Sequence, residues 1–192
     1  MPSKVDICNE ALNQLGSSTI QSLSDTSNIG VLCNRYYDTE LDFLLRTHRW
    51  NSALREATLS YITDATIIIN WDYKFLLPTD PYCLRVLQVE TGDTEINWEI
   101  RGRNLYSTDS VVDVLYVARI TDPNEFDPML YKFMVDLMAY RLAFPVTRSR
   151  EVSEAMYSLY RTSLQDAMSV DSQERTPETI KSEDLLEAAL RS

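Results

Sequence analysis

Glycine and histidine are scarce in this sequence, which has four glycines and a single histidine among 192 residues. Loops that cradle phosphates and turns that bind dinucleotides need glycine-rich patterns, and neither pattern occurs here. A metal site with several histidine ligands is excluded because His48 is the only histidine. We therefore expect no cofactor and no bound metal.

The cysteines are too few and too far apart to form a disulfide framework. Cys8, Cys33 and Cys83 have no CxxC spacing, which also argues against a zinc ribbon. Cys8 and Cys33 fall on the apolar faces of predicted helices, so we expect both to be buried free thiols.

Positive charge and long apolar runs are also lacking. Lysine and arginine number 18 against 29 acidic residues, which gives a formal net charge of -11. Binding to a phosphate backbone depends on cationic side chains, so we expect DNA near this protein to be repelled; the same acidity keeps a protein soluble. No apolar run reaches the roughly 18 residues of a transmembrane helix, and the first residues show no signal-peptide pattern. We expect a protein made in a cytoplasm, with no membrane partner.

Hydrophobic residues make up 44% of the chain, enough for one well-packed domain with an inserted subdomain. Two helices are predicted at its start. Ser3 caps the first helix, with Asp6 in the capping-box position and Gly16 as its stop. The second helix spans residues 28–48, where apolar residues recur at helical spacing.

The periodicity changes between residues 51 and 121, where short alternating runs indicate strands. These runs are 53–62, 84–90, 94–101, 104–106 and 111–120. Gly92-Asp93 and Gly102-Arg103 indicate tight hairpins between neighbouring runs. The pattern predicts a small antiparallel sheet inserted between helices.

Two further helices are predicted after this insertion. Asp127-Pro128 starts the third helix and Pro145 ends it; because it is apolar on most sides, we expect it to be buried between other elements. Ser149 caps a fourth helix that extends to residue 170. A polar stretch and a short amphipathic helix over 185–190 complete the chain as given.

The predicted fold class is α+β and mainly α-helical, with four main helices, a short C-terminal helix and one inserted small antiparallel β-sheet. We expect a helical body from residues 1–50 and 122–170, an inserted β subdomain at 51–121 and a C-terminal arm at 171–192. The apolar end of this arm is too short to stabilise an isolated helix. We therefore expect it to dock on this domain or on a neighbouring molecule. The candidate partner-binding residues are Leu185, Leu186, Ala189 and Leu190.

The stretch 71–86 is the most informative part of the chain, because it combines aromatic residues, two prolines and a short alternating strand. The prolines fix their own backbone angles and force the residues before them into extended conformations. We interpret this stretch as a rigid structural elbow without catalytic chemistry. Its candidate residues are Tyr73, Pro78, Asp80, Pro81, Leu84 and Arg85.

The candidates for catalysis are weak. His48 follows the apolar face of the second helix, which is typical of a histidine at the margin of a core. Two sets of carboxylates have the chemistry for glycan hydrolysis, but 29 acidic residues produce many chance pairs, so solvated faces explain them better. These sets are Glu95 with Glu99, and Asp38, Glu40 and Asp42. Aromatic residues of the β region suit sheet packing by default, with a carbohydrate platform or a protein interface as alternatives.

Three blocks of the sequence resemble a known family. The first block is ICNEALNQLG at 7–16 with IQSLSD at 20–25. The second is Tyr37-Asp38, Leu41-Asp42 and Leu44-Leu45 leading into HRWN at 48–51. The third is the elbow, from Tyr73 through LPTD at 77–80 to LRV at 84–86. In this order and spacing, with the helical C-terminal half, they resemble tail tubular protein A, the head-to-tail adaptor or gatekeeper family of short-tailed bacteriophages.

The resemblance implies a virion structural protein that is not an enzyme. Its subunits would form a ring of about twelve copies between the portal and the tail nozzle, with DNA as passing cargo. The implied partners are the portal protein, the nozzle protein and further copies of this chain, and a monomeric state before assembly is also compatible. The implied location is the neck of the virion, after assembly in the host cytoplasm. A glycan hydrolase associated with the phage tail remains the alternative.

Overall fold

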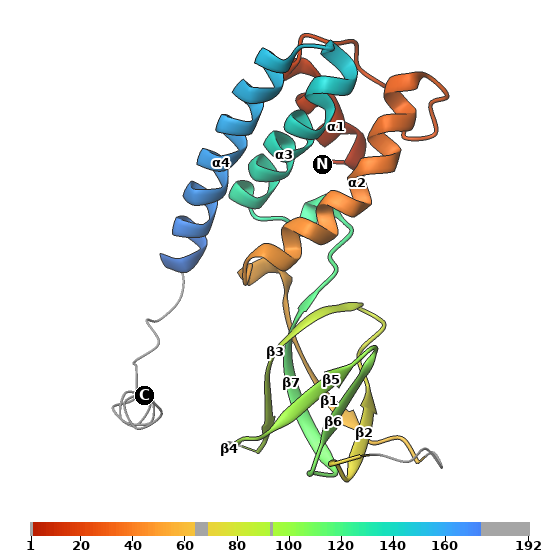
Figure 1. The fold of residues 1–192 in the computed structure, drawn as a ribbon, viewed down its shortest axis with the longest axis vertical. Helices are drawn as coiled ribbons and strands as arrows, with labels where there is room; N and C mark the ends of the chain where they lie inside the picture. Colours follow the sequence, from red (N-terminus) through yellow and green to blue (C-terminus); the bar gives the residue numbers. More distant parts are fainter. Residues whose placement is uncertain (1, 64–68, 93, 174–192) are drawn as a thin grey trace.

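The computed structural model describes residues 2–63, 69–92 and 94–173. The helices form one body, and the strands form a second, smaller unit below it in the view of Figure 1. The chain passes between the two units at two places, next to the short 3-10 helices η1 (Asn51–Ala53) and η2 (Pro123–Glu125). The predicted C-terminal helix at 185–190 lies outside the described residues.

Both N-terminal helices form as predicted. α1 (Lys4–Gln14) begins after Ser3, whose hydroxyl accepts a hydrogen bond from the Asp6 amide. The Asp6 carboxylate accepts in return from the Ser3 amide, which completes the capping box. α2 (Asn28–Thr47) begins after Ser27, whose hydroxyl caps the first turn. The local signals at these two starts therefore suffice to place the helices.

α3 (Pro128–Thr147) begins at Asp127, whose carboxylate accepts from two backbone amides of the first turn. The prediction that Pro145 ends this helix is wrong, because the helix continues to its end at residue 147. Pro145 lies in the last turn, where its missing N–H removes only one hydrogen bond. Arg148 then ends the helix in a left-handed conformation, with φ at 57°.

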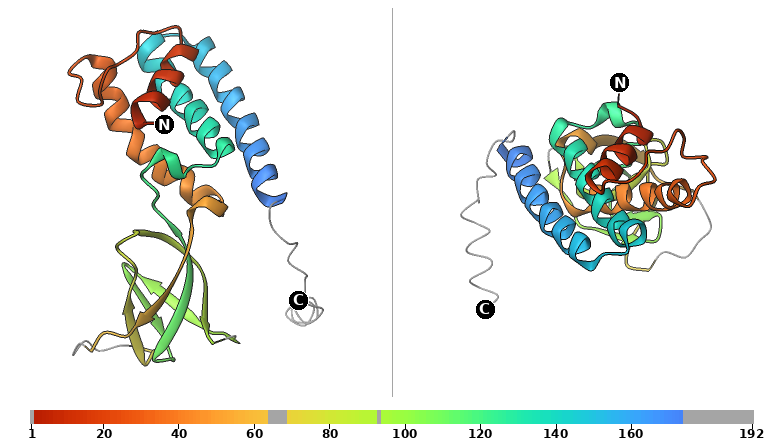
Figure 2. Two further views of the ribbon diagram at one scale, coloured as in Figure 1. Left: turned by 180° about the vertical axis from the view of Figure 1, so that it is seen from behind. Right: turned by 90° about the horizontal axis from the view of Figure 1, so that it is seen from above.

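α3 is the central helix of the body, and the other helices pack around it. It is buried along most of its length between Leu130 and Ala143, as predicted for a helix that is apolar on most sides. α4 (Arg150–Gln173) lies along the outside of the body, beside α3 (Figure 2). α4 extends past the predicted end at residue 170, because Asp171 is held by contacts to the end of α2.

The core of the body includes Trp50, which is fully buried. The indole N–H of Trp50 donates to the carbonyl of Leu44 at 2.8 Å, and the ring lies 6.0 Å from that of Phe133 in α3. Phe133 in turn stacks on Tyr160 of α4, with ring centroids 5.4 Å apart. This series of aromatic contacts connects the end of α2 through α3 to α4.

The β unit contains two sheets, which corrects the predicted fold class with its single inserted sheet. One sheet has four antiparallel strands in the order β1-β7-β3-β4, and the other has three in the order β2-β6-β5. The strands are β1 (Leu54–Ser60), β2 (Tyr73–Leu76), β3 (Cys83–Thr91), β4 (Thr94–Glu95), β5 (Trp98–Arg101), β6 (Asn104–Ser107) and β7 (Val111–Ala118). With 49% helix and 25% strand, the described protein is a mixture of α and β structure and is not mainly helical.

Two local features explain the second sheet. The predicted run at 94–101 divides: β4 pairs with β3, and the chain then turns through Ile96 and Asn97 so that β5 pairs with β6. The other feature is β2, which the sequence indicated only as part of the elbow. Its Phe75 is fully buried and the neighbouring Leu76 is exposed, as alternation in a strand requires, and it pairs with β6.

The two sheets pack face to face around a core of their own and form a small sandwich. Phe75 and Leu105 enter this core from the three-stranded sheet, and Val112 and Tyr116 enter it from β7. Val117, the next residue of β7, packs into the core of the body instead. β7 therefore belongs to both cores and links the sandwich to the helices.

Replacing Trp50 with alanine should destabilise the body. The substitution removes a buried indole and the donor to the Leu44 carbonyl, so we expect the free energy of unfolding to fall by about 3–5 kcal/mol. Chemical denaturation followed by circular dichroism measures the loss. Phe43→Ala is the matched control, because that ring is 50% exposed and its loss should stay below about 1 kcal/mol. Equal losses for the two variants would contradict the role of Trp50.

Candidate functional site

The elbow at residues 71–86 forms a closed turn between β2 and β3, at the place where the sandwich meets the body. The amide of Cys83 donates to the carbonyl of Pro78 at 3.0 Å across this turn, and the peptide between Asp80 and Pro81 is cis. Of the candidate residues, Tyr73 lies in β2, Pro78, Asp80 and Pro81 lie in the turn, and Leu84 and Arg85 lie in β3.

Tyr82, in the elbow turn, lies against two arginine side chains. The guanidinium carbon of Arg103 is 4.0 Å from the centroid of the Tyr82 ring, and that of Arg119 is 4.8 Å away. Arg103 also donates to the carbonyls of Cys83 and Pro78, at 2.6 and 2.7 Å. One guanidinium fork therefore holds the two ends of the turn and covers its aromatic ring.

α2 is attached to the same turn by two side chains. Arg119, which follows β7, pairs with both carboxylate oxygens of Asp42 in α2, and its Nε donates to Oδ1 at 2.6 Å. The hydrogen bonds to Asp42 raise the pKa of Arg119, so its charge is fixed. Arg46, one turn further along α2, donates to the carbonyl of Leu84 in β3. These contacts join the helix, the elbow and the end of β7.

Arg103→Lys should loosen the elbow and leave the rest of the fold intact. Lysine keeps the charge but lacks the planar fork that stacks on Tyr82 while donating to two carbonyls. We expect a loss of about 1–3 kcal/mol in the free energy of unfolding and faster amide exchange at Cys83, measured by NMR. Arg101→Lys is the matched control, because Arg101 pairs with Glu99 at an exposed site. Unchanged exchange at Cys83 in Arg103→Lys would show that the fork does not hold the turn.

The end of α4 is fastened to the end of α2 by Asp171, whose side chain is only 6% exposed. One carboxylate oxygen of Asp171 lies 2.8 Å from Nε2 of His48, and the other accepts from the Asn51 amide at 2.8 Å. The Asn51 side chain donates to the Asp171 carbonyl at 2.9 Å. We call these three residues the α4 latch. His48 also meets the Trp50 ring edge-on, so it lies at the margin of the core, as predicted.

Asp171→Ala should release the last turns of α4. The substitution removes the carboxylate acceptor of the part-buried Asn51 amide, so we expect the local free energy of opening to fall by about 1–3 kcal/mol. Hydrogen exchange along α4 measures this change. Asp166→Ala is the matched control, since Asp166 is an exposed carboxylate of the same helix. If α4 keeps its protection in Asp171→Ala, the latch does not hold the helix end.

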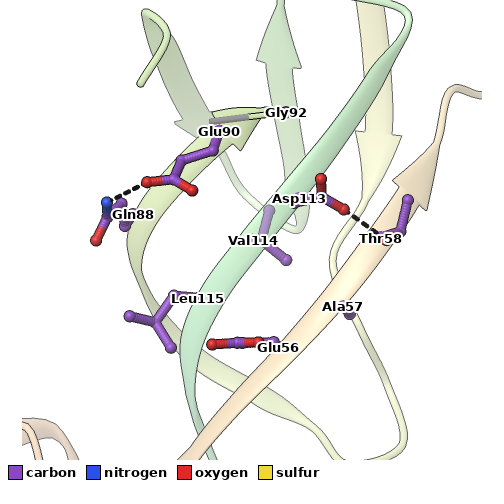
Figure 3. Close-up of a pocket in the computed structure, with 9 residues that line it drawn as sticks. All are labelled: Glu56, Ala57, Thr58, Gln88, Glu90, Gly92, Asp113, Val114 and Leu115. Atoms are coloured by element: carbon purple, nitrogen blue, oxygen red, sulfur yellow. Dashed lines mark hydrogen bonds between the residues drawn. The ribbon is translucent and has the colours of Figure 1, made fainter. Parts of the chain in front are cut away.

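The outward face of the four-stranded sheet is an acidic hollow of about 540 Å³ (Figure 3). Glu56 of β1, Glu90 of β3 and Asp113 of β7 line it. Thr58 donates to Asp113 at 2.5 Å, and the side chain of Gln88 donates to Glu90 at 2.5 Å. No lysine or arginine stands among the described residues that line this hollow. The hollow therefore repels anions.

Three of the five acidic residues considered for glycan hydrolysis are bound to arginines. Glu99 accepts a hydrogen bond from Arg101 at 2.7 Å. This hydrogen bond, followed by the one from Trp71, lowers the pKa of Glu99 to about 2. A general acid needs the opposite shift. Burial raises the pKa of Glu40, but this carboxylate pairs with Arg141 of α3 at 2.6 Å. Asp42 pairs with Arg119, where α2 meets the elbow. These carboxylates serve as structural ion pairs.

The structure places only some of the predicted site residues. The elbow residues from Pro78 onward lie near the junction, whereas Tyr73 packs on Tyr61, just after the end of β1. The predicted partner-binding residues Leu185, Leu186, Ala189 and Leu190 lie outside the described residues. Sequence reasoning missed Tyr82, Arg103 and Arg119, because their contacts join segments far apart in the chain. Asp171 had a local signal: it continues the inward stripe of α4 that includes Ala167, where a carboxylate needs a partner.

The three cysteines are buried and free, as predicted for Cys8 and Cys33. A hydrogen bond with Cys33, together with burial, raises the pKa of the Cys8 thiol. The same hydrogen bond lowers the pKa of Cys33. Because both thiols are buried, the pair packs the contact between α1 and α2.

A scan against protein-family models finds no matching family, and a search of the curated proteins finds no match either. Within residues 2–63, 69–92 and 94–173, no helix is long and apolar enough to cross a membrane. In the same ranges, no group of histidine, cysteine and acidic side chains is arranged to hold a metal ion.

Proposed function

We propose that this protein is a head-to-tail adaptor of a short-tailed bacteriophage. On this proposal it forms a ring of about twelve subunits between the portal and the tail nozzle, and the ring is part of the channel through which DNA is ejected. The protein acts through the geometry of the assembly and not as a catalyst. Its partners are the portal protein, the nozzle protein and other copies of itself, in the neck of the virion.

The observation that carries this proposal is the junction. The sequence blocks that resemble the adaptor family form α1 with the loop after it, α2 and the elbow. Asn9 of the first block exchanges two hydrogen bonds with the backbone of Ile20, which holds the loop after α1 within the helical body. Asp42 of the second block pairs with Arg119, and the Leu84 carbonyl of the elbow accepts from Arg46. Residues of the second and third blocks therefore take part in the contacts between the helical body and the sandwich, which suits a ring subunit with a projecting sheet.

The charge distribution supports passage of DNA and argues against its capture. The formal net charge is -11, and the hollow on the four-stranded sheet exposes three carboxylates with no cation among its described lining residues. Binding to a phosphate backbone requires cations that release counterions. A channel wall that carries such a surface repels DNA and lets it slide, which suits a protein for which DNA is cargo.

Electron microscopy of the protein mixed with the portal protein of the same genome tests the proposal. We expect rings of about twelve subunits stacked on one end of the portal, and native mass spectrometry should give the matching stoichiometry. A portal protein from an unrelated long-tailed phage serves as the control and should carry no ring. A chain that stays monomeric in the presence of its own portal would contradict the proposal.

The glycan hydrolase alternative makes a different prediction for the same preparation. Under it, the protein releases oligosaccharides from the surface glycans of the host, and Glu95→Gln or Glu99→Gln abolishes the release. We expect neither the unmodified protein nor its carboxylate variants to release oligosaccharides. Chromatography of the treated glycans measures the release. Release that depends on one of these carboxylates would replace the adaptor proposal.

A further inference from the structure

A second hollow, of about 540 Å³, lies between α2 and the sandwich, beside the elbow. We call it the junction cleft. Its charged lining residues are four arginines and one aspartate: Arg46, Arg85, Arg103, Arg119 and Asp42. Four of the 18 lysine and arginine residues of the chain therefore line this one cleft. Because a guanidinium that donates to neutral carbonyls keeps its charge, the cleft is strongly cationic.

One of these arginines is available to a ligand. Arg46 and Arg103 donate to backbone carbonyls, and Arg119 pairs with Asp42. The side chain of Arg85 is exposed at the cleft and makes no hydrogen bond or ion pair with any described residue. An anionic ligand is therefore attracted by the whole cluster and can be bound directly by Arg85.

The rest of the cleft is apolar, which restricts the kind of anion that suits it. The buried Leu77 and Val86 line it, together with Trp98 and the 36% exposed Ile100 of β5. A bare phosphate or a nucleic acid backbone would leave this apolar surface uncovered. A short peptide that has both carboxylates and leucine side chains would use both parts of the cleft.

We propose that residues 182–190 of this same chain dock in the junction cleft. This segment, SEDLLEAAL, has three acidic residues and no basic residue, and its apolar side chains are spaced for one face of a helix. The acidic residues are Glu183, Asp184 and Glu187, and the apolar ones are Leu185, Leu186, Ala189 and Leu190. The carboxylates pair with the arginines around Arg85, and the leucines cover the apolar lining.

The length of chain available agrees with docking on the same molecule. The described part of α4 ends at Gln173, just after Asp171, which contacts His48 at the end of α2. Arg46, on the wall of the cleft, is two positions before His48 in the chain. The eight residues 174–181 span at most about 26–29 Å when fully extended, which is ample for this approach. The latch thus brings the described end of α4 close to the end of α2 that carries Arg46.

Paramagnetic relaxation enhancement in the full chain tests the proposal. A spin label is attached through Ala188→Cys, since the three native cysteines are buried and protected from the reagent. We expect strong broadening of the Trp98 indole and Ile100 amide signals, and we expect Arg85→Glu to reduce it to background. Arg35→Glu is the matched control, because Arg35 is an exposed arginine near the other end of α2 and should leave the broadening unchanged.

Mixed samples decide whether the segment docks on its own molecule. In a mixture of spin-labelled unenriched chain and unlabelled isotope-enriched chain, docking within one molecule gives no broadening at Trp98. Broadening in this mixture would overturn the proposal in favour of docking on a neighbouring copy. The proposal would also be overturned if the chain that carries both the spin label and the isotopes showed no broadening at Trp98, or if the broadening survived Arg85→Glu.

Neutralising the segment provides a test that leaves the cleft untouched. The combined variant Glu183→Gln, Asp184→Asn and Glu187→Gln removes the proposed partners of the arginines, so the broadening at Trp98 should fall as it does in Arg85→Glu. Broadening that persists in the combined variant would contradict pairing with the arginines. The experiment uses the isolated chain without portal, so its outcome is independent of the adaptor proposal.

Discussion

The ion pair between Asp42 and Arg119 is the contact on which the arrangement of the two units depends. Its side chains are 29% and 39% exposed, and an isolated pair of this exposure stabilises a fold by about 1 kcal/mol or less. Here the arginine is shared, because it also contacts the ring of Tyr82. The pair therefore acts as one member of a network that includes Arg103, and removal of one member affects the fit of the others. The network therefore helps to define the angle between the helical body and the sandwich.

The attachment of α4 follows the same logic on the other side of the body. Its inward stripe combines Tyr160, which stacks on Phe133, with the small side chains of Ser163 and Ala167. Polar contacts add to the packing that defines its register. Asp136 of α3 is 2% exposed and accepts from Gln14 of α1 at 2.8 Å and from the hydroxyl of Ser163. With Asp171 at the far end, two buried carboxylates hold α4 at two points along its length.

The parts of the fold that the sequence predicts are those fixed by local signals. The capping box at Ser3, the left-handed Gly16 after α1 and the hairpin at Gly102 each depend on a few neighbouring residues. The second sheet was missed because β2 is a four-residue strand next to Pro78, and its partner strand lies some thirty residues further along the chain. Pairing over such a separation leaves no trace in a short window.

The candidate site likewise has one part that the sequence predicts and another part that it does not. The elbow is visible in the sequence because proline and alternation are local properties, and its prolines do form the turn between β2 and β3. What the elbow binds is not visible, since Arg103, Arg119 and Arg46 come from three separate segments. A sequence reveals that a turn is rigid, but the side chains that hold it are brought together only by the fold.

The placement of charge connects the two proposals. A uniformly acidic protein would only repel DNA, but the junction cleft gathers four arginines at a single place. Left open, this cleft would attract the phosphate backbone that the acidic hollow repels. Docking of residues 182–190 would neutralise the cleft and cover Trp98 and Ile100, leaving a surface with little affinity for nucleic acid. In a channel protein, an acidic segment docked in the junction cleft would therefore prevent DNA from binding there as it passes.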